Sequence, residues 1–191
     1  LSIPVKDEET RLNHLSGYFT AVTAMDANVG RILEWLEGNG LRGNTLIVFT
    51  ADNGMNMGHH GVFGKGNATW PLNMWEESVK VPFLVSRPGS VPEGVIRSEL
   101  VSQYDFMPTL LDYLGMDNPE ADMLPGKSFA GLLRGEKVEE PDNVVVYDEY
   151  GPVRMIRSRT HKYVHRYPDG PNEFYDLAAD PDERNDPIDS Q

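Results

Sequence analysis

The fold is decided by the stretch Thr45-Leu-Ile-Val-Phe-Thr-Ala-Asp-Asn-Gly54, in which an apolar run ends in a carboxylate and an amide. The run from Thr45 to Thr50 has no polar alternation, which is typical of a strand covered on both faces, as in a parallel sheet. Asp52 and Asn53 follow it directly, where open α/β sheets place their ligand crevices. Their side-chain oxygens suit Ca²⁺ or Mg²⁺, although either ion needs about six ligands in all. An ordinary Asp-Asn-Gly turn is the alternative that the spacing leaves open.

Helical and strand patterns alternate on either side of this run. Before it, apolar residues recur at spacings of three and four from Ser16 to Leu36, which predicts an amphipathic helix after an extended lead-in over residues 1–15. After it, the sequence favours a second buried strand over 81–86 and shorter helices over 71–79, 102–114 and 128–133. The alternation predicts an α/β fold for residues 1–139, as part of a mixed, mainly parallel sheet flanked by helices.

The last part of the chain, residues 140–191, has a different pattern. Short β-rich segments separated by Gly, Pro and Asp occupy 144–147, 153–157, 162–167 and 173–177. Their close spacing predicts a small antiparallel sheet, and hence a C-terminal subdomain with a polar tail. His161 and His165 share a face of one predicted strand, where a pairing on the surface or in the core is favoured over a metal site.

A glycine-rich loop with cationic side chains follows the Asp-Asn pair. It contains Gly58-His-His-Gly61 and Gly64-Lys-Gly66, where glycine lets the backbone approach an anion closely. Lys65 suits a point-charge contact with a sulfuryl or phosphoryl oxygen, and His60 suits proton donation or an anion contact. The glycine spacing and the Gly after the lysine do not match a nucleotide P-loop. Oxygen ligands beside cationic donors predict a divalent metal that holds an oxygen-rich anionic group.

Composition narrows the classes of partner. The chain carries 17 Lys and Arg against 30 Asp and Glu, and its net charge of −13 disfavours nucleic acid and anionic membrane surfaces. No apolar run approaches the roughly 20 residues that span a bilayer, so no membrane association is expected. There are no cysteines, which excludes disulfides and thiolate metal sites. The chain begins without Met and is interpreted as a piece of something longer.

Ordered segments along nearly the whole chain resemble the type I sulfatases of the alkaline phosphatase superfamily. The helix of residues 18–36 is similar to that family's helix before its second metal-binding strand, and Phe49-Thr-Ala-Asp-Asn-Gly54 resembles its calcium pair. The loop from Gly58 to Lys65 is similar to its Gly-x-His-Gly segment and substrate-contacting lysine. Further similar segments are Glu76 to Pro82, Asp105 to Leu111, and Phe174 to Leu177 with Asp180-Pro181.

The resemblance implies a sulfatase whose Ca²⁺ is held by Asp52, Asn53 and two aspartates from the amino-terminal half. It implies that Lys65 binds a sulfate oxygen, and that His60 contacts the ester or assists protonation of the leaving group. The family's nucleophile is a formylglycine made from Cys or Ser in a Cys/Ser-x-Pro-x-Arg motif. The one near match here, Ser2-Ile-Pro-Val-Lys6, ends in lysine and lies on the wrong side of the helix. We therefore expect the C-terminal part of a sulfatase, inactive alone, whose substrate is a sulfate ester, with sulfated sugars among the candidates.

Two other functions stay open. One is a phosphodiesterase or phosphonate monoester hydrolase of the same superfamily, which shares the crevice but differs in nucleophile and often in metal number. The other is a non-catalytic fragment with a structural or binding role. Dividing a sheet leaves an open edge and bare apolar faces, so self-association or a companion chain is expected. The resemblance further implies a secreted, periplasmic or lysosomal location.

Overall fold

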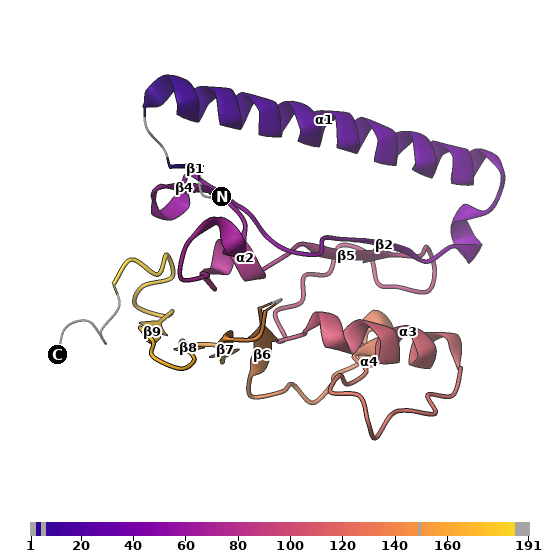
Figure 1. Cartoon of the computed structure of the whole chain (residues 1–191). Coiled ribbons are helices and arrows are strands. Elements are labelled where there is room, and N and C mark those ends of the chain that lie inside the picture. Colours follow the sequence, from indigo (N-terminus) through magenta and orange to yellow (C-terminus); the bar gives the residue numbers. More distant parts are fainter. Residues whose placement is uncertain (1–2, 5–6, 149, 186–191) are drawn as a thin grey trace.

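The computed structural model describes residues 3–4, 7–148 and 150–185 of the chain, and the elements lie in layers (Figure 1). The long helix α1 (Glu8–Gly38) runs along one side. Next to it lies a two-stranded sheet of β2 (Ile47–Thr50) and β5 (Phe83–Ser86). On the far side of that sheet lie α3 (Phe106–Leu114), α4 (Ala130–Leu133) and a four-stranded sheet. The candidate site residues therefore belong to the middle layer.

Helix α1 begins at Glu8, so the prediction of an extended lead-in over residues 1–15 is wrong. The Asp7 carboxylate caps the helix by accepting the Thr10 N–H at 2.7 Å, and Glu8 and Glu9 complement the positive end of the helix dipole. These acidic residues therefore mark the start of the helix. The helix ends at Gly38, and Gly40 follows in the left-handed region at φ 67°.

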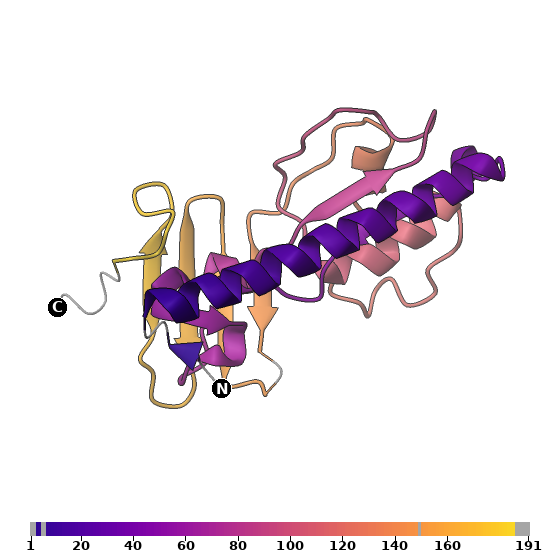
Figure 2. The same cartoon turned by 90° about the horizontal axis from the view of Figure 1, so that it is seen from above.

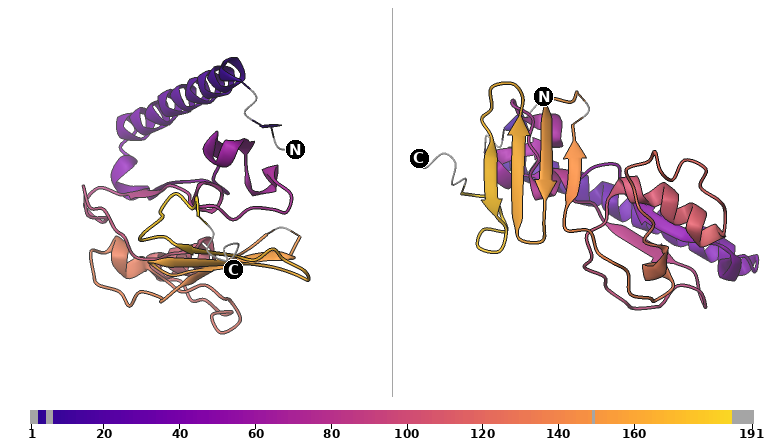
Figure 3. Two further views of the ribbon diagram at one scale, coloured as in Figure 1. Left: turned by 90° about the vertical axis from the view of Figure 1, so that its left-hand side faces the viewer. Right: turned by 90° about the horizontal axis from the view of Figure 1, so that it is seen from below.

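The apolar face of α1 is incompletely covered. None of its residues is buried, and Phe19, Ile32 and Trp35 are 61%, 60% and 60% exposed. Figure 2 shows the helix crossing the molecule from above, and the left view of Figure 3 shows it standing apart as a separate layer. The predicted helix is confirmed, but the described part of the chain leaves much of its apolar surface exposed.

Strands β2 and β5 pair antiparallel, with Ile47 opposite Ser86 and Thr50 opposite Phe83. The expectation of a mainly parallel sheet is wrong for the described residues, which contain no parallel pair. The physical reason is the path of residues 51–82, which fold back on themselves and return to the end of the sheet where β2 finished. An apolar run predicts burial but not the direction of its neighbour. With β5 as its one described partner, β2 is half-buried rather than fully buried.

The connection between β2 and β5 holds several short elements. Strands β3 (Asn56–Met57) and β4 (Val62–Gly64) pair antiparallel, and β1 (Ile3–Pro4) adds to β4. The one-turn helix α2 (Glu76–Val79) precedes β5. The helix predicted over 71–79 is therefore confined to its last four residues. Four short 3₁₀ turns are also present in the described chain: Arg42–Asn44, His59–Gly61, Gly66–Ala68 and Gln103–Asp105.

The four-stranded sheet confirms the predicted C-terminal antiparallel sheet (Figure 3, right). Its strands pair in chain order: β6 (Val144–Tyr147), β7 (Val153–Arg157), β8 (His161–Arg166) and β9 (Glu173–Asp176). The inner face packs on the segment before α2, in a core made of Leu72, Met74, Val153, Met155, Val164, Tyr175 and Leu177. This core joins residues on both sides of position 139, and the division into two domains stays a prediction.

The remaining helices agree with the sequence in type. Ser102 caps the 3₁₀ turn before α3: its hydroxyl accepts the Tyr104 N–H, while the Asp105 side chain accepts the Ser102 N–H. Gly115 ends α3 at φ 67°. In the part of the chain that the structure describes, none of the helices combines the length and apolarity that a bilayer crossing would need.

Candidate functional site

Asp52 and Asn53 lie at the carboxyl end of β2, as the sequence predicts for this pair. Asp52 is exposed, and its Oδ1 accepts the Asn53 backbone N–H at 2.9 Å. The backbone is held from the α3 side, because Gln103 Nε2 donates to the carbonyl oxygens of Ala51 and Asp52 at 2.8 and 3.1 Å. Sequence reasoning missed Gln103, since its position at the start of a helical segment gives no sign of where its side chain reaches.

The structure brings Asn53 and Lys65 together across 12 residues of sequence. Lys65 Nζ donates to Asn53 Oδ1 at 3.0 Å, and Asn53 Nδ2 donates to the Gly54 carbonyl at 2.7 Å. Asp52, Asn53 and Lys65 all line one open cavity of about 1640 Å³. A carboxylate, an amide oxygen and an ammonium group thus share one rim, which allows binding of a cation and an anion side by side.

The turn after Asn53 requires glycine. The Gly54 N–H donates to the Ser78 carbonyl at 2.9 Å, so the backbone of α2 lies directly against the turn. A Cβ atom at position 54 would lie 2.0 Å from the Glu77 carbonyl oxygen. Any side chain here would push the Asp-Asn pair away from α2.

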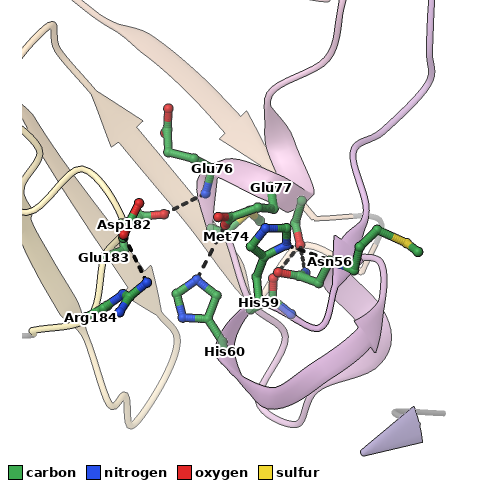
Figure 4. Close-up of polar contacts among 12 residues, drawn as sticks. Asn56, His59, His60, Met74, Glu76, Glu77, Asp182, Glu183 and Arg184 are labelled. Carbon is green, nitrogen blue, oxygen red and sulfur yellow. Dashed lines mark hydrogen bonds and ion pairs between the residues drawn. The ribbon is translucent and has the colours of Figure 1, made fainter. Parts of the chain in front are cut away.

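His60 has a different set of contacts from Lys65. Its ring stacks on Trp75, with centroids 4.0 Å apart and an interplanar angle of 12°. Its Nε2 lies 3.4 Å from Glu77 Oε2 (Figure 4). Its backbone is in the left-handed region at φ 52°. His59 accepts the Met57 N–H on Nδ1 at 3.2 Å. His60 is not among the described residues that line the cavity. Its catalytic role stays a prediction.

A buried ion cluster fixes the start of α2 to the C-terminal sheet. Lys162 Nζ lies 2.7 Å from Glu76 Oε1 and 2.7 Å from Glu183 Oε1, and it donates to the Met74 carbonyl at 2.9 Å. Arg157 makes two further contacts with Glu76, at 3.0 and 3.1 Å. Glu183 Oε2 accepts the Glu76 N–H at 2.6 Å, as Figure 4 shows. Sequence reasoning missed Lys162 and Glu183, because strand alternation predicts an apolar residue at position 162.

The pKa values of the two carboxyl groups in this cluster are shifted in opposite directions. Burial raises the pKa of Glu183, and the contacts with Lys162 offset this only in part. Burial also acts to raise the pKa of Glu76, but the hydrogen bonds and charges of Arg157 and Lys162 outweigh it, so the pKa of Glu76 falls below its ordinary value. Glu76 therefore stays ionised to lower pH than Glu183.

The residues predicted to bind a metal are only part of the ligand set that Ca²⁺ needs. No group of three or more His, Asp or Glu side chains gathers for a metal within residues 3–4, 7–148 and 150–185. Asp52 and Asn53 offer two hard oxygens, which fit Ca²⁺ as members of a larger ligand set. His161 and His165 lie on the outer face of β8, opposite the buried Lys162 and Val164.

Comparisons with known proteins agree with this fold. A sequence model of the sulfatase family matches residues 4–116. An N-acetylglucosamine-6-O-sulfatase of Bacteroides thetaiotaomicron is 33% identical in an alignment of 187 positions, which covers 90% of this chain and 31% of that protein. An ulvan-active sulfatase of Formosa agariphila is 30% identical over 96% of this chain and 36% of its own length. The solved structure of a 2-O glycosaminoglycan sulfatase superposes with a TM-score of 0.80 and 28% identity, over 95% of this chain and 40% of that one.

These similarities place the chain in the alkaline phosphatase superfamily. Within it, the chain belongs to the type I sulfatase family, since the family model covers more than half of its residues. The chain spans about a third of the length of the curated relatives it matches, at 31% and 36%. The sequence resemblance is thereby confirmed at the level of the family.

Proposed function

We propose that the full-length protein carrying this chain hydrolyses sulfate esters of carbohydrates to an alcohol and inorganic sulfate. The contact between Lys65 Nζ and Asn53 Oδ1 at 3.0 Å, beside the Asp52 carboxylate, is the observation that carries the proposal. Two of the similar proteins support the substrate class, because their names specify an N-acetylglucosamine 6-O-sulfate and a glycosaminoglycan 2-O-sulfate. The chain alone is expected to lack turnover.

Asp52 and Asn53 are the residues of this chain that would hold Ca²⁺, with further ligands from elsewhere in the full-length protein. When bound, Ca²⁺ supplies positive charge that orients the nucleophile and attracts the sulfate group. The nucleophile itself, a formylglycine by resemblance to the family, would also come from outside this chain. The near match at Ser2 to Lys6 lies partly outside the described residues and is not proposed for this role.

Lys65 is proposed to donate a hydrogen bond to a sulfate oxygen. In the structure its ammonium group already contacts an uncharged amide oxygen on the cavity rim, so a bound anion would replace a weaker acceptor. Positive charge placed there stabilises the negative charge that grows on the transferring group in the transition state. Lys65 is thus assigned both binding and transition-state stabilisation.

His60 is proposed to contact the ester or to protonate the leaving alcohol oxygen. Nε2 faces the Glu77 carboxylate at 3.4 Å, so Nδ1 is the nitrogen that we assign to the ester oxygen. Stacking on Trp75 fixes the plane of the ring. General acid catalysis of this kind contributes typically about 10²–10⁴-fold to a rate.

The test is hydrolysis of 4-nitrophenyl sulfate and of sulfated monosaccharides by the full-length protein, with Lys65→Ala as the variant. We expect sulfate release that Lys65→Ala lowers by at least about 100-fold. Lys137→Ala, at another exposed lysine away from the cavity lining, is the matched control and keeps full activity. Faster turnover of a phosphonate monoester or phosphodiester than of any sulfate ester would overturn the proposal in favour of phosphoryl chemistry.

A further inference from the structure

Three buried polar side chains form a continuous hydrogen-bonded row beside the candidate site. Asn56, Asn73 and Ser78 are 0%, 2% and 4% exposed. Asn56 Nδ2 donates to Ser78 Oγ at 2.7 Å, and Ser78 Oγ donates to Asn73 Oδ1 at 2.6 Å. They come from β3, the segment before α2, and α2 itself. The row therefore joins both sides of the connection between β2 and β5.

The row reaches the backbone next to both candidate residues. Asn73 Nδ2 donates to the Gly66 carbonyl at 3.1 Å and to the Lys65 carbonyl at 3.5 Å, and the Asn73 N–H donates to the Gly66 carbonyl at 3.0 Å. At the other end, the Ser78 carbonyl accepts the Gly54 N–H at 2.9 Å. The backbones that carry Lys65 and Asn53 are thus held by one unit.

Burial makes this arrangement specific. A buried amide or hydroxyl that loses its partner is left desolvated without compensation, so the members of the row have few alternatives to their present contacts. The amide group of Asn73 uses its oxygen for Ser78 and its nitrogen for the loop, and therefore links α2 to the loop through a single planar group. A side chain without these polar atoms would leave only the backbone N–H of Asn73 to hold the Gly66 carbonyl from this segment.

We propose that Asn73 is a positioning residue, which sets the distance between the Lys65 ammonium group and the Asp52-Asn53 pair. This inference rests on the proposed role of Lys65. Asn73 does not touch the sulfate ester. It acts by holding the Lys65 and Gly66 carbonyls against α2, on the same unit that holds Gly54. A misplacement of about 1 Å at such a site can cost about 100-fold in rate.

The first test is hydrogen–deuterium exchange of the full-length protein. Asn73→Leu removes the amide and keeps the number and branching of the side-chain heavy atoms, and we expect faster exchange in residues 62–69 with unchanged exchange in β7 and β8. Thr109→Val is the matched control, because Thr109 is 2% exposed and its Oγ1 accepts the Phe129 N–H at 2.9 Å. It removes one buried hydrogen bond elsewhere and is expected to leave residues 62–69 protected. Unchanged exchange of these residues in Asn73→Leu would overturn the proposal.

The second test is steady-state kinetics with 4-nitrophenyl sulfate. We expect Asn73→Leu to lower kcat by about 10–100-fold and to change KM by less than about threefold, because Lys65 acts mainly on charge in the transition state. Thr109→Val should keep kcat within about twofold of the unmodified protein. If Asn73→Leu does not fold, Ser78→Ala breaks the same row and is judged by the same criteria.

The outcomes separate the two proposals. An unmodified protein without sulfatase activity overturns the proposed function. An active protein in which the Asn73 or Ser78 variant keeps the kcat of Thr109→Val overturns the positioning role and leaves the proposed function standing. A loop that exchanges faster while kcat stays unchanged also overturns the positioning role.

Discussion

Replacing Lys162 by methionine tests the buried ion cluster that holds α2 to the C-terminal sheet. Lys162 is 0% exposed and contacts Glu76 and Glu183 at 2.7 Å each, and the Met74 carbonyl at 2.9 Å. Methionine has a similar length but no charge. Glu76 would keep its contacts with Arg157, whereas Glu183 would lose its cation in a buried place. The variant therefore measures what an uncompensated carboxylate costs here.

The expected loss is about 3–5 kcal/mol in the free energy of unfolding, the usual range when one partner of a buried ion pair is removed. For a unit of about 150–250 residues, 1 kcal/mol shifts the melting temperature by about 2–4 °C, so we expect a decrease of about 6–20 °C. Protonation of Glu183, whose pKa is already raised by burial, favours the lower part of this range. The double variant Lys162→Met/Glu183→Gln removes both charges and should be more stable than Lys162→Met alone.

The measurement is urea unfolding at neutral pH, followed by circular dichroism, with thermal unfolding as a second readout. Arg11→Met is the matched control, because Arg11 Nη2 contacts Glu8 Oε1 at 2.6 Å but both side chains are exposed. It should leave the unfolding midpoint unchanged. A loss below about 1 kcal/mol for Lys162→Met, or equal stability of the single and double variants, would refute the reasoning.

Four further predictions follow from the structure. Glu76→Gln should lower the free energy of unfolding most at neutral pH and progressively less below pH 4.5, because a carboxylate with a lowered folded-state pKa stabilises only while ionised. Urea unfolding from pH 3 to 7 checks this, and a loss of stability that grows in acid would contradict it. Gly54→Ala should cost about 1–3 kcal/mol in the same assay, while Gly43→Ala, which meets nothing within 4 Å, should be neutral. In the full-length protein, Asp52→Ala should lower calcium affinity by calorimetry together with kcat, and unchanged values of both would remove Asp52 from the site. The isolated chain should not turn over 4-nitrophenyl sulfate, and a rate abolished by Lys65→Ala would disprove this.

The types of most elements could be predicted from the sequence, because local periodicity determines them. The strands of the C-terminal sheet alternate in burial, and turn residues separate them clearly. The direction of β5 could not be predicted, because it depends on the folding of the 51–82 connection. The start of α1 was misplaced for a different reason. The side chain of Asp7 caps the helix, and a helix whose first turn is polar shows no apolar periodicity there.

The candidate site could be predicted in part. The residues proposed to carry its chemistry, Asp52, Asn53 and Lys65, lie in a glycine-rich context that the sequence makes visible, and their roles stay predictions. The residues that hold them were not visible. Asn73 and Gln103 are ordinary polar residues in the sequence, and their importance comes from contacts across 7 and 51 residues. Such support depends on tertiary packing, which no local pattern encodes.

The long-range hydrogen bond between Glu183 and α2 has a practical consequence for protein engineering. Glu183 reaches back 107 residues to the Glu76 N–H. A recombinant version that stops at Asp180 would keep every strand of the C-terminal sheet, yet it would leave the first turn of α2 without that acceptor and Lys162 with one carboxylate fewer. The choice of vector boundary or affinity tag at this end would then alter the neighbourhood of Trp75 and His60, far upstream in the polypeptide.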